Sequence, residues 1–214
     1  MGVVYLCAMS LKTMILLPVA RFISSMVRRH AKSALADQDR IFHTLIKDAG
    51  NTAFGNDHGF DRINSYDDFK RQVPVRDYEG LKSYFDRIAM GEKNVLWPGQ
   101  PKYLAKTSGT TSGIKYIPVS KNSVPNHIRS ARNAIFNYMA VKGSAAIFEG
   151  KMIFLSGSPE LETKGGVPTG RLSGIVNHEV PAWIRTNQLP SWKTNCIEDW
   201  EEKLEAVIKE TLHQ

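Results

Sequence analysis

The stretch KYLAKTSGTTSGIKYIPVSK, residues 102–121, decides how the rest of the chain is organised. Two short runs of strand-forming residues flank a loop of small residues at positions 107–113. Gly109 and Gly113 allow positive φ angles, so successive backbone N–H groups can point inward and hold an anion. The loop hydroxyls add donors, and Lys115 adds a positive charge just after the loop. The sequence therefore predicts a β-hairpin whose loop binds phosphate groups, with a triphosphate as the expected ligand.

Two other interpretations compete with the phosphate loop. A cluster of Ser, Thr and Gly often marks only a turn, but an ordinary hairpin loop has about two to five residues and requires no lysine here. A Walker P-loop has four residues between its glycines, followed by Gly-Lys-Ser/Thr and a helix. In this chain three residues separate the glycines, Ile114 precedes Lys115, and residues 116–119 are strand-like. The Walker interpretation is therefore rejected, and the plain turn stays open.

Residues around the loop indicate a family. The loop, a run of small residues between two strands with a lysine just after it, resembles the phosphate loop of the acyl-adenylate-forming superfamily. A wider set of segments resembles the Gretchen Hagen (auxin-responsive promoter) family of acyl-acid-amido synthetases in its bacterial form. These segments are VPVRDYE (residues 73–79), LWPG (96–99), KTSGTTSGIKYIP (106–118) and PNH (125–127). The resemblance runs from about Ser10 to the end of the chain.

The resemblance implies an α/β fold, namely the N-terminal part of the large domain of an acyl-adenylate-forming enzyme. Helices and a partial β-sheet with a phosphate-loop β-hairpin are expected. Residues 10–214 would form the N-terminal portion of the adenylation domain, and residues 1–9 an extension or a mis-called start. The family's proteins are much longer, so the later nucleotide motifs and the C-terminal domain are expected beyond Gln214. The chain is therefore interpreted as a fragment that is inactive by itself.

The implied reaction is a two-step ligation. A carboxylate attacks the α-phosphorus of ATP to give an acyl-adenylate and pyrophosphate, and an amino acid then displaces AMP to form an amide. The implied ligands are ATP, Mg²⁺, a small carboxylic acid and an amino acid, and Lys115 is the implied catalytic residue. The implied phosphate-binding residues are Thr107, Ser108, Gly109, Thr110, Thr111, Ser112 and Gly113.

The helix predicted over residues 125–141 carries the candidates for acyl-acid binding. Arg129 and Arg132 lie three positions apart and so share a helix face. In plant relatives the matching helix lines the acyl-acid pocket, so either arginine is a candidate for binding the substrate carboxylate. A solvated basic face is the alternative interpretation.

Composition limits the other possibilities. The chain has 214 residues, a hydrophobic content of 42% and a charged content of 23%, as in ordinary globular proteins of one or two domains. Most of its net charge of +7 lies before Asp37, and the remainder is nearly balanced, so no nucleic-acid groove is expected. Cys7 and Cys196 have no metal-ligating neighbours and indicate free thiols in a reducing compartment, the cytoplasm. No protein-held metal site is predicted, and the complete protein is expected to be a monomer.

Local signals predict the remaining helices. Apolar residues at helical spacing over residues 16–47 predict two packed helices. A membrane-surface helix is the alternative, because the basic residues lie on another face. Ser65 is expected to cap a helix over residues 65–71, and Asp77 one over residues 78–90 that stops at Gly91. Tyr78, which recurs in the family, is interpreted as part of a scaffold that holds this helix near the phosphate loop.

The other segments have weaker signals. Residues 51–58 are predicted to form a loop with an exposed His58. A buried strand is predicted over residues 151–158, a loop over 160–170 and a short irregular segment over 171–177. An amphipathic helix is predicted over residues 197–212, with Trp200 among its packed residues.

Three classes of function therefore stay open. The first is the amido synthetase, with a coenzyme A-type acyl ligase of the same superfamily as its nearest rival. The second is a non-catalytic module that binds a nucleotide or an acyl acid, which would bind ATP without pyrophosphate exchange. The third is a protein that contacts membrane surfaces through its basic N-terminal helix.

Overall fold

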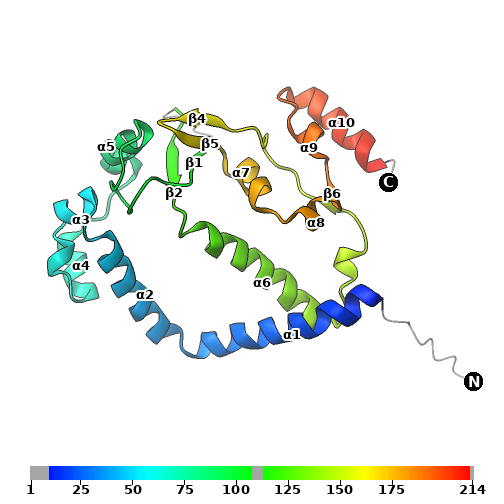
Figure 1. Ribbon diagram of the computed structural model, residues 1–214, viewed down its shortest axis with the longest axis horizontal. Coiled ribbons are helices and arrows are strands. Elements are labelled where there is room, and N and C mark those ends of the chain that lie inside the picture. Colours follow the sequence, from blue (N-terminus) through cyan, green and yellow to red (C-terminus); the bar gives the residue numbers. More distant parts are fainter. Residues whose placement is uncertain (1–9, 108–112, 213–214) are drawn as a thin grey trace, which may run out of the picture.

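The computed structural model describes residues 10–107 and 113–212, apart from the side chain of Trp183. Figure 1 shows the elements in chain order. The helices are α1 (Leu11–Lys32), α2 (Ala34–Ala49), α3 (Ala53–Asp57), η1 (Phe60–Arg62), α4 (Tyr66–Gln72), α5 (Tyr78–Ala89), α6 (Val124–Lys142), η2 (Ala146–Phe148), α7 (Leu172–Glu179), α8 (Ala182–Arg185), α9 (Trp192–Asn195) and α10 (Trp200–Leu212). The strands are β1 (Tyr103–Lys106), β2 (Tyr116–Val119), β3 (Met152–Ile153), β4 (Glu162–Lys164), β5 (Val167–Arg171) and β6 (Gln188–Leu189).

The main sheet has the strand order β2-β1-β5-β4. β1 and β2 form the predicted antiparallel hairpin, with Lys106 opposite Tyr116 at the end that carries the loop. β1 also pairs in parallel with β5, and β5 pairs antiparallel with β4. A second, small sheet joins β3 and β6 in parallel. The expected α/β fold with a partial sheet is therefore confirmed.

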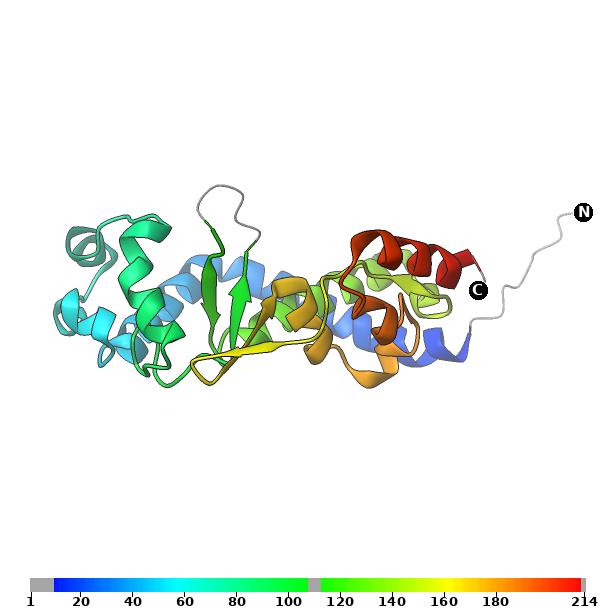
Figure 2. The same ribbon diagram turned by 90° about the horizontal axis from the view of Figure 1, so that it is seen from above.

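Helices cover both faces of the main sheet. On one face Tyr84 and Ile88 of α5 pack on Leu104 of β1 and Val167 of β5. On the other face Tyr103, Ala105 and Val119 of the hairpin pack on Val124 of α6 and Ile175 of α7. Figure 2 shows α5 and α7 on opposite sides of β1 and β2. This arrangement follows from the alternation of side chains along a strand, which gives the short hairpin two buried faces.

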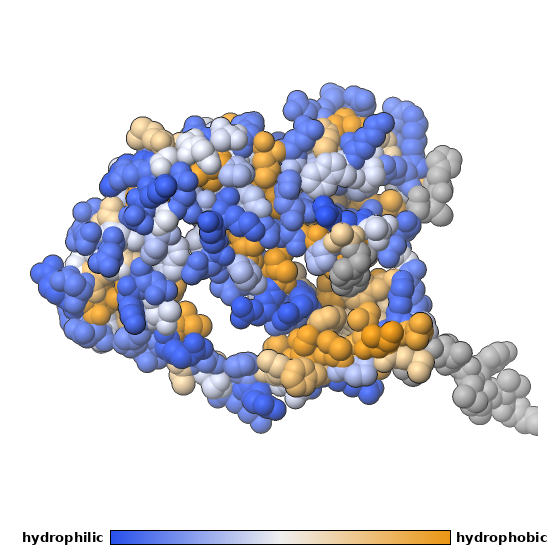
Figure 3. Space-filling view, viewed as in Figure 1, coloured by the Kyte–Doolittle hydropathy of each residue, from blue (hydrophilic) through white to orange (hydrophobic). Residues whose placement is uncertain are grey.

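The two predicted N-terminal helices are confirmed as α1 and α2, but few of their residues are buried against the rest of the protein. α1 packs on α6 around Ala20 and Met139, and Ser24 donates a hydrogen bond to Asn137 Oδ1 at 2.7 Å. Much of the rest of α1 is open: Figure 3 shows apolar side chains gathered over it. The exposed large apolar residues of α1 are Leu11, Met14, Ile15, Val19, Phe22, Met26 and Val27. Among the described residues, no helix is both long enough and apolar enough to cross a membrane.

Helix boundaries follow the predicted capping residues. Ser65 Oγ accepts a hydrogen bond from Asp68 N at 3.2 Å and begins α4. Asp77 Oδ1 accepts one from Gly80 N at 2.9 Å and begins α5. Gly91 follows the end of α5 with a φ of 96°, a conformation that glycine adopts readily. The side chains of Ser65 and Asp77 thus pair with backbone N–H groups that the first turn of a helix leaves unpaired.

The predicted loop over residues 51–58 is wrong in its structure and in the environment of His58. Residues 53–57 form α3, which Thr52 caps by accepting a hydrogen bond from Gly55 N at 3.0 Å. His58 is only 7% exposed. Its ring stacks on Phe54 at 4.0 Å, and its Nδ1 lies 2.8 Å from the carbonyl oxygen of Phe54. The Tyr84 ring of α5 also lies 6.5 Å from the His58 ring, so local and tertiary contacts together surround a residue that the polar sequence around it had suggested was exposed.

Four predictions in the C-terminal third also need correction. The expected strand over residues 151–158 is limited to β3, and Leu155 is 66% exposed. The expected loop over 160–170 is instead the β4–β5 hairpin, whose turn contains Gly165 and Gly166 at positive φ. Residues 172–179 form the regular helix α7 instead of an irregular segment. The terminal helix is confirmed as α10, but Trp200 is 66% exposed, so its apolar face is not packed as predicted.

Candidate functional site

The end of the β1–β2 hairpin holds the described residues of the candidate phosphate site, which are Thr107, Gly113 and Lys115. The backbone N–H of Thr107 donates a hydrogen bond to the carbonyl oxygen of Lys115 at 3.0 Å, which continues the pairing just beyond the strands. Gly113 has a φ of 80°, and no described atom lies within 4 Å of where a Cβ would be. A glycine with this φ can turn a backbone N–H group toward an anion.

Five of the predicted phosphate-binding residues lie outside the described residues. They are Ser108, Gly109, Thr110, Thr111 and Ser112. Their roles stay predictions, as do the phosphate contacts of Thr107, Gly113 and Lys115.

Lys115 lies against the first residue of α5. Its Nζ is 4.8 Å from the centre of the Tyr78 ring. The Tyr78 hydroxyl accepts a hydrogen bond from the backbone N–H of Tyr116 at 3.1 Å. α5 is therefore attached directly to the base of the loop, as expected for a scaffold residue at position 78.

Two other lysines of the hairpin have carboxylate partners. Lys106 Nζ lies 2.6 Å from Glu162 Oε2, and Lys102 Nζ lies 2.5 Å from Glu179 Oε1. Among the ion pairs of the described residues, none involves Lys115. Lys115 is therefore the hairpin cation whose charge is available to an incoming anion.

Glu179 fixes the last turn of α7 to the start of the hairpin. Its Oε1 also accepts a hydrogen bond from the hydroxyl of Tyr103 at 2.6 Å. Burial opposes ionisation of Glu179, but the hydrogen bonds from Lys102 and Tyr103 outweigh it and lower the pKa of the carboxyl. Burial and the neighbouring carboxylate raise the pKa of Tyr103 to about 12. Lys102, Tyr103 and Glu179 thus pair with one another and support the hairpin, so we do not assign this cluster to a ligand.

Arg129 and Arg132 lie on the exposed surface of α6. Arg132 Nη2 donates to Asn133 Oδ1 at 3.1 Å. No described hydrogen bond or ion pair joins either arginine to the hairpin. The structure therefore places both arginines on the helix that follows the hairpin, but it does not bring them into contact with Lys115.

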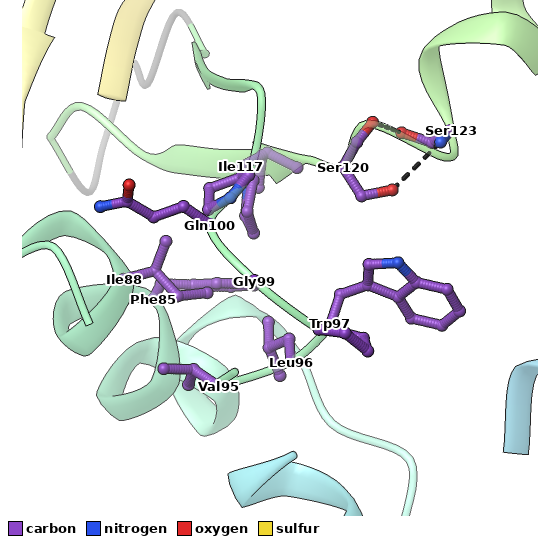
Figure 4. A pocket seen from close by; sticks show the side chains of 13 residues that line it. Phe85, Ile88, Val95, Leu96, Trp97, Gly99, Gln100, Ile117, Ser120 and Ser123 are labelled. Atoms are coloured by element: carbon purple, nitrogen blue, oxygen red, sulfur yellow. Dashed lines mark hydrogen bonds between the residues drawn. The ribbon is translucent and has the colours of Figure 1, made fainter. Parts of the chain in front are cut away.

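A pocket of about 310 Å³ lies beside β2. Figure 4 shows Phe85 and Ile88 of α5 on one side of it, Ile117 of β2 on another, and Trp97 at its edge. Ser123 closes one end through a hydrogen bond from its N–H to Ser120 Oγ at 3.1 Å. Its described lining carries no charge, so it suits an apolar group. Local sequence does not predict this pocket, because folding brings its walls together from α5, residues 95–101 and β2.

A second pocket of about 370 Å³ lies between α7, α8 and α9. Asn177, Gln188 and Arg185 are among its lining residues, and Arg185 is the only charged one among the described residues. Lys115 lines neither pocket. The described residues of the candidate phosphate site, which also include Thr107 and Gly113, are therefore absent from the described lining of both pockets.

The described residues also bear on metal binding. They contain no group of three or more His, Cys, Asp or Glu side chains placed to hold a metal ion.

Comparison with known proteins decides the family. Residues 23–213 match the model of the GH3 family N-terminal domain. The chain belongs to the GH3 family. This confirms the resemblance to the Gretchen Hagen family that the loop and its flanking segments indicated.

Known GH3 proteins resemble the chain over part of their length. It is 34% identical over 138 residues to the indole-3-acetic acid-amido synthetase GH3.15 of Arabidopsis thaliana, covering 61% of this chain and 23% of that protein. It is 24% identical over 164 residues to the jasmonoyl-L-amino acid synthetase JAR4 of Nicotiana attenuata, covering 74% and 28%. The chain thus spans about a quarter of the length of these two relatives.

Solved GH3 structures share the fold. A structure of the GH3.15 acyl acid amido synthetase matches with a TM-score of 0.69 and 21% identity, over 86% of this chain and 32% of that one. A second, of GH3.15 in complex with 2,4-DB, matches with a TM-score of 0.59 and 25% identity, over 75% and 28%. The arrangement of helices and partial sheet is therefore that of a GH3 protein.

Proposed function

We propose that this chain is the phosphate-binding part of an acid–amino acid ligase. The complete enzyme would adenylate a carboxylic acid with ATP and pass the acyl group to an amino acid to form an amide. The observation that carries the proposal is the position of Lys115, unpaired among described carboxylates, beside the backbone bond from Thr107 that closes the base of the loop. Relatives named as amido synthetases support this assignment.

The chemistry requires a site of this kind. A carboxylate reacts poorly with an amine because its leaving group would be oxide, and conversion to an acyl-adenylate supplies AMP as a good leaving group. Negative charge builds on the departing pyrophosphate during the first step. Preorganised N–H and O–H donors and the Lys115 ammonium would stabilise that charge.

The individual roles in the loop are part of this proposal. The backbone of Gly109 and Gly113 would allow the required conformation, and the loop hydroxyls would bind phosphate oxygens. The residues with hydroxyl groups are Thr107, Ser108, Thr110, Thr111 and Ser112. We infer that Mg²⁺ arrives with ATP, and that residues 10–214 belong to the N-terminal portion of the adenylation domain.

Arg129 and Arg132 are proposed to meet the carboxylate of the acyl acid. Both guanidinium groups are exposed on α6, so a substrate or a further part of the enzyme has access to them. Because the loop, Lys115 and both arginines come from one chain, a monomer is the proposed active form. Cys196, described as a free thiol, agrees with a reducing compartment such as the cytoplasm.

Carboxylate-dependent exchange of pyrophosphate into ATP tests the proposal in the complete enzyme. Lys115→Ala is expected to lower the exchange rate at least tenfold, which corresponds to about 1.4 kcal/mol in the activation barrier. Lys121→Ala is the control, because Lys121 is exposed just beyond β2. An unchanged rate in Lys115→Ala would remove this lysine from the mechanism. ATP binding without exchange would favour the non-catalytic module, and coenzyme A as the acceptor would favour the thioester-forming ligase.

A second candidate function is weak contact with a membrane surface through α1. The exposed apolar side chains of this helix are accompanied by basic residues, with the first acidic residue of the chain only at Asp37. This combination is typical of helices that lie on anionic lipid surfaces. Sedimentation with anionic vesicles, weakened by salt and by Phe22→Asp, is the expected result. Equal sedimentation with neutral vesicles would argue against it.

A further inference from the structure

Tyr78 makes three contacts at the base of the candidate phosphate loop. Its ring faces the Lys115 ammonium at 4.8 Å, its hydroxyl accepts a hydrogen bond from the backbone N–H of Tyr116 at 3.1 Å, and the ring stacks on Phe85 at 4.9 Å. These contacts come from the hairpin and from the next turns of α5. A residue that only supports the fold would not need all three contacts, so we consider a more specific role for Tyr78.

The ring is held at both ends. At its backbone end, Asp77 caps α5 through a hydrogen bond from Gly80 N, so the first helical residue has a fixed backbone. At its hydroxyl end, the bond from Tyr116 N ties the ring to β2. Phe85 supports the ring at an interplanar angle of 27°. A ring fixed in this way can set the position of a flexible lysine side chain.

An aromatic ring suits this position better than a carboxylate. Lys102 and Lys106 are held by Glu179 and Glu162 at 2.5 and 2.6 Å, so their charges are already neutralised. A carboxylate below Lys115 would likewise compete with phosphate for the ammonium. The face of a ring attracts the cation through its quadrupole but carries no net charge. It therefore orients Lys115 and leaves its charge and its donors for the ligand.

We propose that Tyr78 is a positioning residue that holds the Lys115 ammonium at the base of the phosphate loop. The inference rests on the proposed function, because the purpose of the arrangement is the binding of nucleotide phosphates. Tyr78 acts through Lys115 and needs no contact with the nucleotide.

A double-mutant cycle on ATP affinity of the complete enzyme tests the inference. Tyr78→Leu removes the ring and is expected to weaken ATP binding by about threefold to fivefold, the range for a partly exposed cation–π contact. Tyr78→Phe keeps the ring and is expected to retain most of the affinity. When Lys115 is already alanine, Tyr78→Leu should cause no further loss. Equal losses from Tyr78→Leu with and without Lys115 would overturn the inference.

Tyr66 provides a matched control. Like Tyr78, it is the first residue of a helix with a side-chain cap, and the Nζ of Lys70 lies 5.3 Å from its ring centre. Tyr66→Leu therefore removes a similar contact away from the hairpin. It should leave ATP affinity unchanged. A loss equal to that of Tyr78→Leu would mean that the effect is general destabilisation, which would overturn the inference.

Proton NMR of the lysine side chains gives a readout that does not depend on the nucleotide. The Cε protons of Lys115 should be shifted upfield by the ring in the wild type and in Tyr78→Phe, and should return to the ordinary position in Tyr78→Leu. Absence of the upfield shift would overturn the inference. If Lys115→Ala leaves ATP affinity unchanged, the proposed function of Lys115 fails. If Lys115→Ala weakens binding but Tyr78→Leu does not, only the role of Tyr78 fails.

Discussion

The carboxylate of Glu179, at the end of α7, accepts a hydrogen bond from the hydroxyl of Tyr103, at the start of β1, at 2.6 Å. Lys102 reaches the same oxygen at 2.5 Å. A single side chain thus joins α7 to the strand that leads into the candidate phosphate loop. Substitution of Glu179 should therefore lower the stability of the hairpin.

Glu179→Ala should lower the free energy of unfolding by about 1–3 kcal/mol, because the buried residue Tyr103 loses the acceptor of its hydroxyl group. Urea denaturation measures the change. Glu205→Ala is the control, since Glu205 forms an exposed pair with Lys209 and should cost at most about 1 kcal/mol. Equal effects of the two substitutions would contradict the structural role of Glu179.

The stability of the protein should depend on the ionisation of Tyr103 at alkaline pH. The pKa of this tyrosine is about 12 in the folded state against an ordinary value of about 10, so the folded state keeps a proton that the unfolded state releases. Its contribution is complete below about pH 10 and is lost as the pH rises toward about 12. Wild type should therefore lose more stability across this window than Tyr103→Phe. Parallel urea-denaturation curves for the two proteins would show that Tyr103 does not contribute.

The turn of the β4–β5 hairpin should not tolerate a side chain at Gly165. Its φ is 55°, and a Cβ there would lie 2.5 Å from both Ala89 O and Gly91 N. Gly165→Ala should therefore lower the free energy of unfolding by about 2–4 kcal/mol, combining backbone strain with a clash.

Gly143→Ala is the matched control for this substitution. Gly143 also has a positive φ, of 69°, but no described atom lies within 4 Å of its added Cβ. It should cost about 1 kcal/mol from backbone conformation alone. Thermal unfolding of the two variants separates strain from clash, and equal melting temperatures would show that the clash is relieved.

Lys203 should stabilise the attachment of α10 although it pairs with no described carboxylate. It is 8% exposed and donates hydrogen bonds to the carbonyl oxygens of Asn195 at 2.7 Å and Ser156 at 3.2 Å. Lys203→Met keeps the length of the side chain but leaves both carbonyls without this donor. A loss of about 1–3 kcal/mol is expected in urea denaturation. Lys209→Met, at an exposed position of the same helix, should change stability by less than about 0.5 kcal/mol.

The features that the sequence predicted well depend on short-range signals. The caps at Ser65 and Asp77, the stop at Gly91 and the hairpin around residues 107–113 each depend on a few neighbouring residues. The burial of His58 could not be predicted in this way, because it depends on how α3 lies against α5, where the centre of the Tyr84 ring is 6.5 Å from that of His58.

For the candidate site as well, local sequence indicates some features and not others. The loop and Lys115 have a recognisable local pattern. The contact between the Lys115 ammonium and the Tyr78 ring, in contrast, depends on how α5 packs on the sheet. The parallel pairing of β1 with β5 likewise joins segments on either side of α6, and local sequence carries no signal for it. The apolar pocket beside β2 was missed for the same reason.

The strand order of the main sheet has a consequence for synthesis on the ribosome. β1 lies between β2, which follows it directly in the chain, and β5, which is made only after α6, η2, β3 and β4. The hairpin can therefore close early, while the second edge of β1 keeps its backbone groups open until β5 has left the exit tunnel. An unpaired edge of this kind is a template for pairing with other chains. Nascent chains that stall between α6 and β5 should be the form of this protein most in need of a chaperone.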